Sequence, residues 1–194
     1  TTELDNGGVR WQLMDLRLLG FGEGDFFPNF AHGTAGIAWM FATLYKESKV
    51  ERYLDLAKRA VVYLQSIAVG DESGTLIPYL DNPKTGPTWD KYYLSTCHGP
   101  VGTTLVFRML YELTGEQEFL EYAKRTADVL VGDSQLLDGK RRWMSAWNRP
   151  TPEVVKSFTG FYVGSAGGSS SLLKLYSAIE NKPFTDIFEY IYFD

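Results

Sequence analysis

The chain of 194 residues has little of three features that mark specialised classes: cysteine, blocks of basic residues and long apolar runs. Its single cysteine, Cys97, cannot form an internal disulfide and fits a reducing compartment, so we expect a cytoplasmic protein. No apolar run reaches the roughly 18–20 residues of a membrane span. The net charge of −5 argues against a nucleic-acid or anionic-membrane partner, because Lys and Arg are spread along the chain. The remaining composition, 44% hydrophobic and 22% charged, is that of an ordinary globular protein.

Histidine is also scarce, and both copies fall in related motifs. The first motif is Ala31-His32-Gly33-Thr34-Ala35-Gly36, and the second is Cys97-His98-Gly99-Pro100-Val101-Gly102. A third copy, Tyr162-Val163-Gly164-Ser165-Ala166-Gly167, has the glycines without the histidine. Each copy opens an apolar run of helical period, so the glycines are expected to allow a tight turn and close approach of a neighbour.

The motifs belong to an internal repeat. An ungapped offset of 66 aligns His32 with His98 and continues through Tyr45 and Tyr111, and an offset of 65 carries the alignment to the third copy. Each unit predicts a first helix, a short turn and a second helix. The predicted first helices run from the second glycine to about Lys46, Leu113 and Ala178, and the predicted second helices are 50–67, 117–131 and 184 to the chain end.

Stacked helical hairpins with their loops on one face make an α/α solenoid or, when the row closes, an α/α toroid. We therefore predict an all-α fold, a single domain over residues 1–194 with about three hairpins in an open or partial ring. The Gly- and aromatic-rich connections allow short strands. A connection at 7–11 precedes the first hairpin, which predicts that the domain is the C-terminal part of a longer toroid.

These motifs resemble those of the lanthionine synthetase C-like family, whose members are α/α toroids. The first two copies look like the family's Ala-His-Gly-x-x-Gly and Cys-His-Gly-x-x-Gly motifs, and the third is similar to Phe-Glu-Gly-x-x-Gly, with Val163 in place of Glu. In that family a zinc ion held by two cysteines and one histidine activates a peptide thiol. The thiol adds to dehydroalanine or dehydrobutyrine and forms a thioether. The resemblance therefore implies a peptide or small thiol substrate.

Carried over by position, Cys97 and His98 match two zinc ligands, and His32 matches a histidine that handles protons. A second ligand cysteine has no match, because Cys97 is the only cysteine. A catalytic zinc site usually has three protein ligands, so zinc binding is an open expectation, with His32 as a possible third ligand. The alternative is a small buried thiol beside a histidine that anchors its loop.

His32 has two interpretations. Imidazole exchanges protons near neutral pH, which suits a general acid that protonates the enolate formed by thiol addition. The other interpretation is a histidine that hydrogen-bonds the neighbouring turn.

The sequence thus predicts a lanthionine synthetase C-like protein that adds cysteine thiols to dehydrated residues, an enzyme if its metal site is completed. The first alternative is a non-catalytic peptide-binding or scaffolding module of that family. The second is a carbohydrate-active α/α enzyme, which needs paired carboxylates. Its candidate acids are Asp25, Asp71, Asp90 and Asp133. Aromatic residues in the connections could line a cleft or pack the loops; they are Trp11, Phe26, Phe27, Tyr79, Trp89, Tyr92, Tyr93, Trp143 and Trp147.

Overall fold

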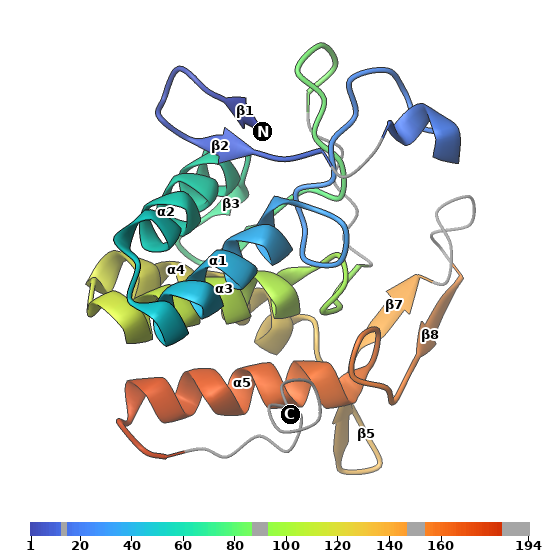
Figure 1. Cartoon of the computed structure of the whole chain (residues 1–194). Helices are drawn as coiled ribbons and strands as arrows, with labels where there is room; N and C mark the ends of the chain where they lie inside the picture. The colour runs from blue at the N-terminus through green and yellow to red at the C-terminus, as the bar shows by residue number, and fades with distance from the viewer. Residues whose placement is uncertain (13–14, 87–92, 147–153, 184–194) are drawn as a thin grey trace.

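The computed structural model describes residues 1–12, 15–86, 93–146 and 154–183, and helices dominate it (Figure 1). A short 3-10 helix, η1, precedes the first motif. The helices are η1 (Leu16–Leu19), α1 (Thr34–Ser48), α2 (Glu51–Ser66), α3 (Pro100–Thr114), α4 (Gln117–Gly132) and α5 (Ser165–Ile179). The predicted hairpins α1–α2 and α3–α4 are confirmed. The second helix predicted from residue 184 lies outside the described residues.

The motif glycines set where the first helices begin. Gly33, Gly99 and Gly164 are the N-cap residues of α1, α3 and α5, each with an extended backbone, so the helices start two residues earlier than predicted. Pro100 fits the start of α3 because the first helical N–H needs no partner within the helix. Past the helix ends, the chain turns through left-handed backbone at Lys49, Gly115 and Asn181.

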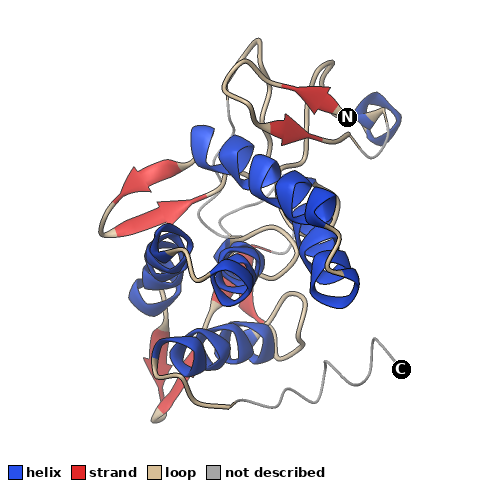
Figure 2. Cartoon of the chain, turned by 60° about the vertical axis from the view of Figure 1, so that its left-hand side comes forward, coloured by secondary structure: helices blue, strands red, loops and turns tan. Residues whose placement is uncertain are grey.

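The first helices of the three repeats form one row. α3 packs between α1 and α5, while α2 packs on α1 and α4 packs on α3. Figures 1 and 2 show this order, with α5 beyond the two complete hairpins. The largest hydrophobic cluster lies between these first helices and the second helices α2 and α4. It includes Phe107 and Leu110 of α3 with Val61 and Leu64 of α2. The predicted stacking is therefore confirmed for two complete hairpins and the first helix of the third repeat.

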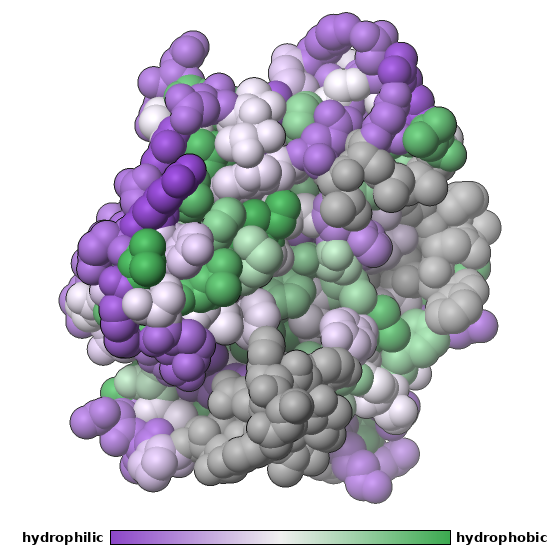
Figure 3. Space-filling model, viewed as in Figure 1, coloured by the Kyte–Doolittle hydropathy of each residue, from purple (hydrophilic) through white to green (hydrophobic). Residues whose placement is uncertain are grey.

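Position in the row decides how much of a helix is buried. Every residue of α3 from Pro100 to Leu110 is buried. Met40 and Leu44 of α1 are 44% and 40% exposed, whereas their equivalents in α3, Val106 and Leu110, are fully buried. Figure 3 shows hydrophobic surface over α1, bordered by hydrophilic side chains over α2. The apolar positions that are exposed on α1 are thus the ones that are buried in α3, one repeat later.

The connections contain strands, which corrects the all-α class. Four antiparallel two-stranded sheets pair β1 with β2, β3 with β4, β5 with β6 and β7 with β8. In the β5–β6 hairpin, Asp138 and Gly139 both have positive φ, 50° and 72°, the backbone of a type I′ turn. The strands are β1 (Thr2–Glu3), β2 (Val9–Arg10), β3 (Val69–Asp71), β4 (Gly74–Leu76), β5 (Gln135–Leu137), β6 (Lys140–Arg142), β7 (Met144–Ala146) and β8 (Val155–Ser157).

Two further expectations concern the whole chain. Among the described residues, no helix is both long and apolar enough to cross a membrane. Closure of the row into a toroid, and its extension by further repeats, stay predictions.

Candidate functional site

The three motif loops meet at the N-terminal ends of α1, α3 and α5. The backbone N–H of Ala31 donates to the carbonyl of Cys97 at 2.9 Å, and the N–H of Cys97 donates to the carbonyl of Tyr162 at 3.3 Å. These three residues hold the same position in the three motif copies. The predicted convergence of the motifs on one face is therefore confirmed, and a repeated backbone hydrogen bond holds them together.

The two glycines of each motif are required by close approach. A Cβ at the first glycine of the first copy, Gly33, would lie 2.0 Å from the carbonyl oxygen of Phe27, and a Cβ at Gly36 would lie 2.1 Å from that of Phe30. In both cases the obstructing carbonyl lies six residues earlier. The other two copies repeat this geometry, with distances of 2.1–2.4 Å at their first glycines and 2.0–2.3 Å at their second. The glycines are thus explained by the fold.

In the second and third copies, a side chain from the preceding repeat also packs closely against the second glycine. A Cβ at Gly102 would lie 2.6 Å from the Cβ of Phe30, and one at Gly167 would lie 2.8 Å from the Oγ1 of Thr96. Phe30 and Thr96 are equivalent residues just before their own motifs. Each repeat therefore seats a side chain against the helix start of the next.

The repeat brings the two histidines side by side. The ring centroids of His32 and His98 are 5.4 Å apart. His32 is exposed and His98 is half-buried, and the backbone N–H of His98 lies 3.4 Å from the Oγ of Ser95, which accepts its hydrogen bond. In the third copy the equivalent position holds Val163, which is 42% exposed. Only His32 of the pair is exposed, and its catalytic role stays a prediction.

Aromatic rings surround the histidine pair. The buried ring of Phe27 lies 6.0 Å from His32 and 5.8 Å from His98, between centroids. Tyr79 lies 4.9 Å from His98 and 4.9 Å from Tyr93, whose ring is 6.2 Å from His98. We call Phe27, Tyr79 and Tyr93 the aromatic wall. It makes the surroundings of the histidines apolar on the protein side.

Other aromatic residues from the connections pack the loops. Trp11 contacts Phe41, and Trp143 is buried with its Nε1–H donating to the carbonyl of Leu130 at 2.6 Å. Phe26 lies under the guanidinium of Arg10 at 3.7 Å. The packing interpretation is thus confirmed for these residues, and the cleft interpretation stays a prediction for the others. Trp89, Tyr92 and Trp147 lie outside the described residues.

A buried ion pair, which the sequence did not indicate, holds two of the loops that carry the aromatic wall in place. Arg10 donates to the carboxylate of Asp81 at 3.0 Å, and both side chains are about nine-tenths buried. The hydroxyl of Tyr63 donates to the same oxygen at 2.9 Å. Asp81 also forms a backbone bridge with Phe26, which fixes the loops that carry Phe27 and Tyr79. No local sequence pattern signals this network, because its members lie up to 71 residues apart.

The donor set for zinc falls short in the described part of the chain. Cys97 and His98 adjoin in the second motif, and burial raises the pKa of the Cys97 thiol, which disfavours the thiolate that a metal needs. Among the described residues, no three His, Cys, Asp or Glu side chains gather as metal ligands. The residues described here therefore do not fit a complete zinc site, and His32 does not complete one.

The candidate acids of a carbohydrate enzyme have other partners. Asp25 accepts hydrogen bonds from the backbone N–H of Gly22 and from the side chain of Asn82. Asp71 accepts from the hydroxyl and the backbone N–H of Ser73 in the β3–β4 turn, and these hydrogen bonds lower the pKa of its carboxyl group. Asp133 caps the end of α4 with its backbone N–H. Asp90 lies outside the described residues. These local roles give no support to a pair of catalytic carboxylates.

Comparisons with known proteins bear on the first of these motifs. A comparison with curated proteins gave no match. A family model described as lanthionine synthetase C-like protein matches residues 21–89, about a third of the chain. The matched segment contains His32, Phe27 and Tyr79 but ends before Cys97 and His98. The match supports the family suspected from the motifs: over residues 21–89, the segment that carries the first histidine motif, the chain is similar to lanthionine synthetase C-like proteins.

Proposed function

We propose that the face formed by the motif loops binds a peptide with a dehydrated residue and adds a cysteine thiol to it. The observation that carries this proposal is the pairing of His32 and His98, 5.4 Å apart and backed by the aromatic wall. The proposal rests on the family match for the reaction class and on this geometry for the residues.

The addition moves one proton and forms one bond. The thiol loses its proton, the sulfur bonds to the β-carbon of the dehydroalanine, and the π-electron pair moves toward the carbonyl to give an enolate. The α-carbon then takes a proton, so the product is a thioether with no leaving group. His32 is the residue for this proton transfer because it is the exposed member of the pair. A neutral imidazole takes the thiol proton and returns it to the α-carbon.

The aromatic wall contributes binding and orientation. Phe27 is only 6% exposed, so its ring forms a fixed apolar support for both histidines. Tyr79 and Tyr93, both half-buried, offer ring faces and edges to an apolar side chain of a peptide. Excluding water from one side of the histidine pair would favour protonation at carbon over competing exchange with solvent.

The proposal contains no step through zinc. In the family that the motifs resemble, zinc activates the thiol. Here Cys97 and His98 would be two of its ligands, and the described residues offer no third. Thiol addition in this chain is therefore expected to proceed in the presence of a chelator at an unchanged rate.

The test is the rate of adduct formation between a dehydroalanine peptide and N-acetylcysteine, followed as a mass increase. Wild-type protein should exceed the rate without protein, and His32→Asn should lower the protein-dependent rate by about 10²–10⁴-fold, the usual contribution of a general acid or base. Val163→Ala is the matched control, because Val163 holds the position of His32 in the third motif. A wild-type rate equal to the background would overturn the catalytic proposal.

The second candidate is a non-catalytic peptide-binding module of the same family. The observation that favours it is the incomplete donor set around Cys97 and His98. It predicts that the same dehydroalanine peptide binds without turnover, and that Phe27→Ala weakens binding while His32→Asn does not. Turnover above background that depends on His32 would exclude it.

A further inference from the structure

The hairpin of β5 and β6 is exposed along almost its whole length. All residues from Gln135 to Arg141 are exposed, and Arg142 is half-buried. In Figure 1, β5 extends beyond α5, away from the row of first helices. Neighbouring residues on a strand point to opposite faces, so exposure of every residue from 135 to 141 means that both faces of the hairpin meet solvent.

Two large apolar side chains lie on this hairpin next to its turn. Leu136 is 65% exposed and Leu137 is 49% exposed. In the antiparallel register, Leu136 is opposite Arg141 and Leu137 is opposite Lys140. Residues that are directly opposite in a sheet share a face. Each face of the hairpin therefore carries one exposed leucine beside one cation.

The hairpin also concentrates positive charge. Lys140-Arg141-Arg142 is the only run of three consecutive basic residues in the sequence. Among the described residues, no carboxylate forms an ion pair with any of the three. Arg141 donates to the hydroxyl of Ser134, which is uncharged. Three cations and one carboxylate, Asp138 in the turn, give the segment a net charge of +2 in a chain of −5.

The equivalent hairpin of the preceding repeat has neither feature. By strand register, Gly70 and Asp71 of β3 hold the places of Leu136 and Leu137. Strand β4 contains no charged residue and packs on α4, with Thr75 buried. A hairpin in this connection therefore requires neither exposed leucines nor a basic strand.

Protection of a strand edge does not account for this surface. Charged residues on an exposed edge strand hinder pairing with other chains, which gives the cations a structural use. Exposed leucines on the same hairpin have the opposite effect, because exposed apolar surface favours association. The two features together indicate a partner that is both negatively charged and apolar.

We propose that the β5–β6 hairpin binds the surface of an anionic lipid bilayer, with its two leucines among the acyl chains and its cations at the headgroups. A bilayer supplies negative charge at the headgroups and an apolar region directly below them. It also surrounds an inserted hairpin and covers both faces, whereas a flat protein surface covers one. The long stems of Lys140 and Arg141 can lie along the leucines while their charges reach the headgroups.

The net charge of −5 does not prevent this contact, although the sequence alone predicts no such partner. Charges in solution are screened over about 8 Å at physiological ionic strength, so the projecting hairpin meets the lipid surface before the rest of the chain does. This surface is separate from the motif face and does not depend on the proposed thiol addition.

The test is co-sedimentation of the intact chain with vesicles of phosphatidylcholine that contain about one-third phosphatidylserine, compared with phosphatidylcholine alone. The wild type should bind the anionic vesicles, and added salt should weaken the binding. Lys140→Gln should weaken it about fivefold, the usual contribution of one basic residue at such a surface. Leu137→Ser should weaken it about tenfold, because an apolar side chain no longer leaves water.

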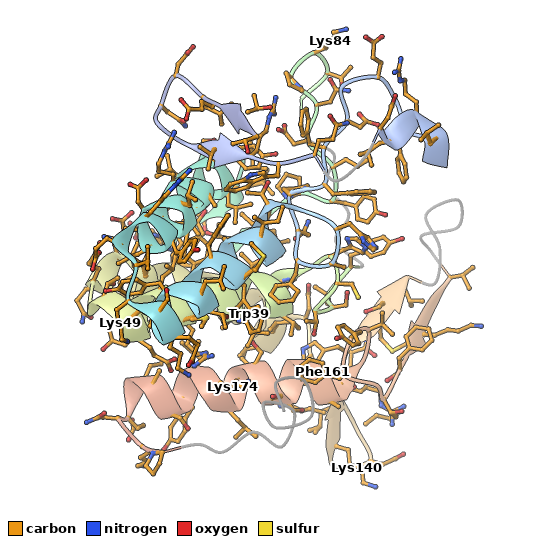
Figure 4. All side chains as sticks on the ribbon, in the orientation of Figure 1. Trp39, Lys49, Lys84, Lys140, Phe161 and Lys174 are labelled. Carbon is orange, nitrogen blue, oxygen red and sulfur yellow. The ribbon has the colours of Figure 1, made fainter. Side chains whose placement is uncertain are left out.

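Asp138→Asn should have the opposite effect. Asn-Gly keeps the type I′ turn while the negative charge nearest the lipid is lost, so binding should strengthen about fivefold. The matched controls are Lys49→Gln, at another exposed cation, and Leu18→Ser, at a leucine that is 79% exposed. Figure 4 shows Lys49 and Lys140 at well-separated points of the molecule. Both controls should leave vesicle binding unchanged.

Three outcomes would overturn the proposal. They are no binding of the wild type to anionic vesicles, wild-type binding by Lys140→Gln and Leu137→Ser, and binding to phosphatidylcholine alone that is as strong. Binding to polyglutamate without binding to vesicles is a case of the first outcome and would assign the hairpin to an acidic protein partner. His32→Asn should bind vesicles as the wild type does, which separates this surface from the motif face.

Discussion

The two interfaces between neighbouring repeats, α1 with α3 and α3 with α5, share their motif ends and differ elsewhere. Both have the backbone hydrogen bond between equivalent motif residues, and both seat a side chain of one repeat on the second glycine of the next. The first interface carries a histidine on each side, whereas the second has Val163 opposite His98. Away from the motifs, the first is packed with Ala42 and Met109, and the second carries Arg108 and Lys174 at the equivalent positions.

The comparison separates what the fold needs from what it leaves free. Features present at both interfaces, the glycines and the backbone bridge, are explained by stacking alone. Features present at one interface are the candidates for chemistry. The histidine pair belongs to this second group.

The largest expected effect is at the shared glycines. Gly102→Ala puts a Cβ 2.3 Å from the carbonyl of Thr96 and 2.6 Å from the Cβ of Phe30, and neither neighbour can move without shifting backbone. We expect a loss of more than about 4 kcal/mol in the free energy of unfolding, measured in urea. Gly167→Ala should lower the free energy of unfolding by as much, because the added Cβ would lie 2.0 Å from the carbonyl oxygen of Phe161.

The control is Gly132→Ala at the end of α4, where nothing lies within 4 Å of the added carbon. Alanine is the better helix former, so stability should change by less than about 1 kcal/mol. Similar losses for Gly102→Ala and Gly132→Ala would show that close approach does not hold the repeats together.

A smaller effect distinguishes the side chains that the glycines accept. Phe30→Ala removes an aromatic ring that packs on Trp39 and against Gly102, and should cost about 2–4 kcal/mol. Thr96→Ala removes a smaller side chain and one hydrogen bond to the carbonyl of Phe161, and should cost about 1–2 kcal/mol. Urea unfolding of both variants measures which of the two losses in stability is larger. A larger loss for Thr96→Ala would mean that the second interface, not the first, is the stronger one.

Much of the fold could be predicted because the repeat is visible in the amino-acid sequence. The offset of 66 residues predicts that His32 and His98 take equivalent places in adjacent hairpins, and stacking then brings them together. The ends of α2 and α4 also fell within a residue of prediction, since left-handed turns and amphipathic periods are local signals.

The rest depends on contacts between segments remote in sequence. Phe27 and Tyr79 were predicted only as loop aromatics, and nothing local distinguishes them from Trp11, which packs the loops instead. The bond between Arg10 and Asp81 spans 71 residues. In the sequence Arg108 is one charge on a helix, and only the structure shows that it is buried and pairs with Glu112.

We propose that His32 and His98 form one binding site, and a direct test is possible because the chain contains only these two histidines. The measurement is an NMR spectrum of the imidazole side chains, assigned with His32→Asn, before and after addition of a dehydroalanine peptide. We predict that both imidazole signals shift on addition of the peptide, and that His32→Asn moves the signal of His98, 5.4 Å away. A His98 signal unchanged by both the substitution and the peptide would contradict the claim.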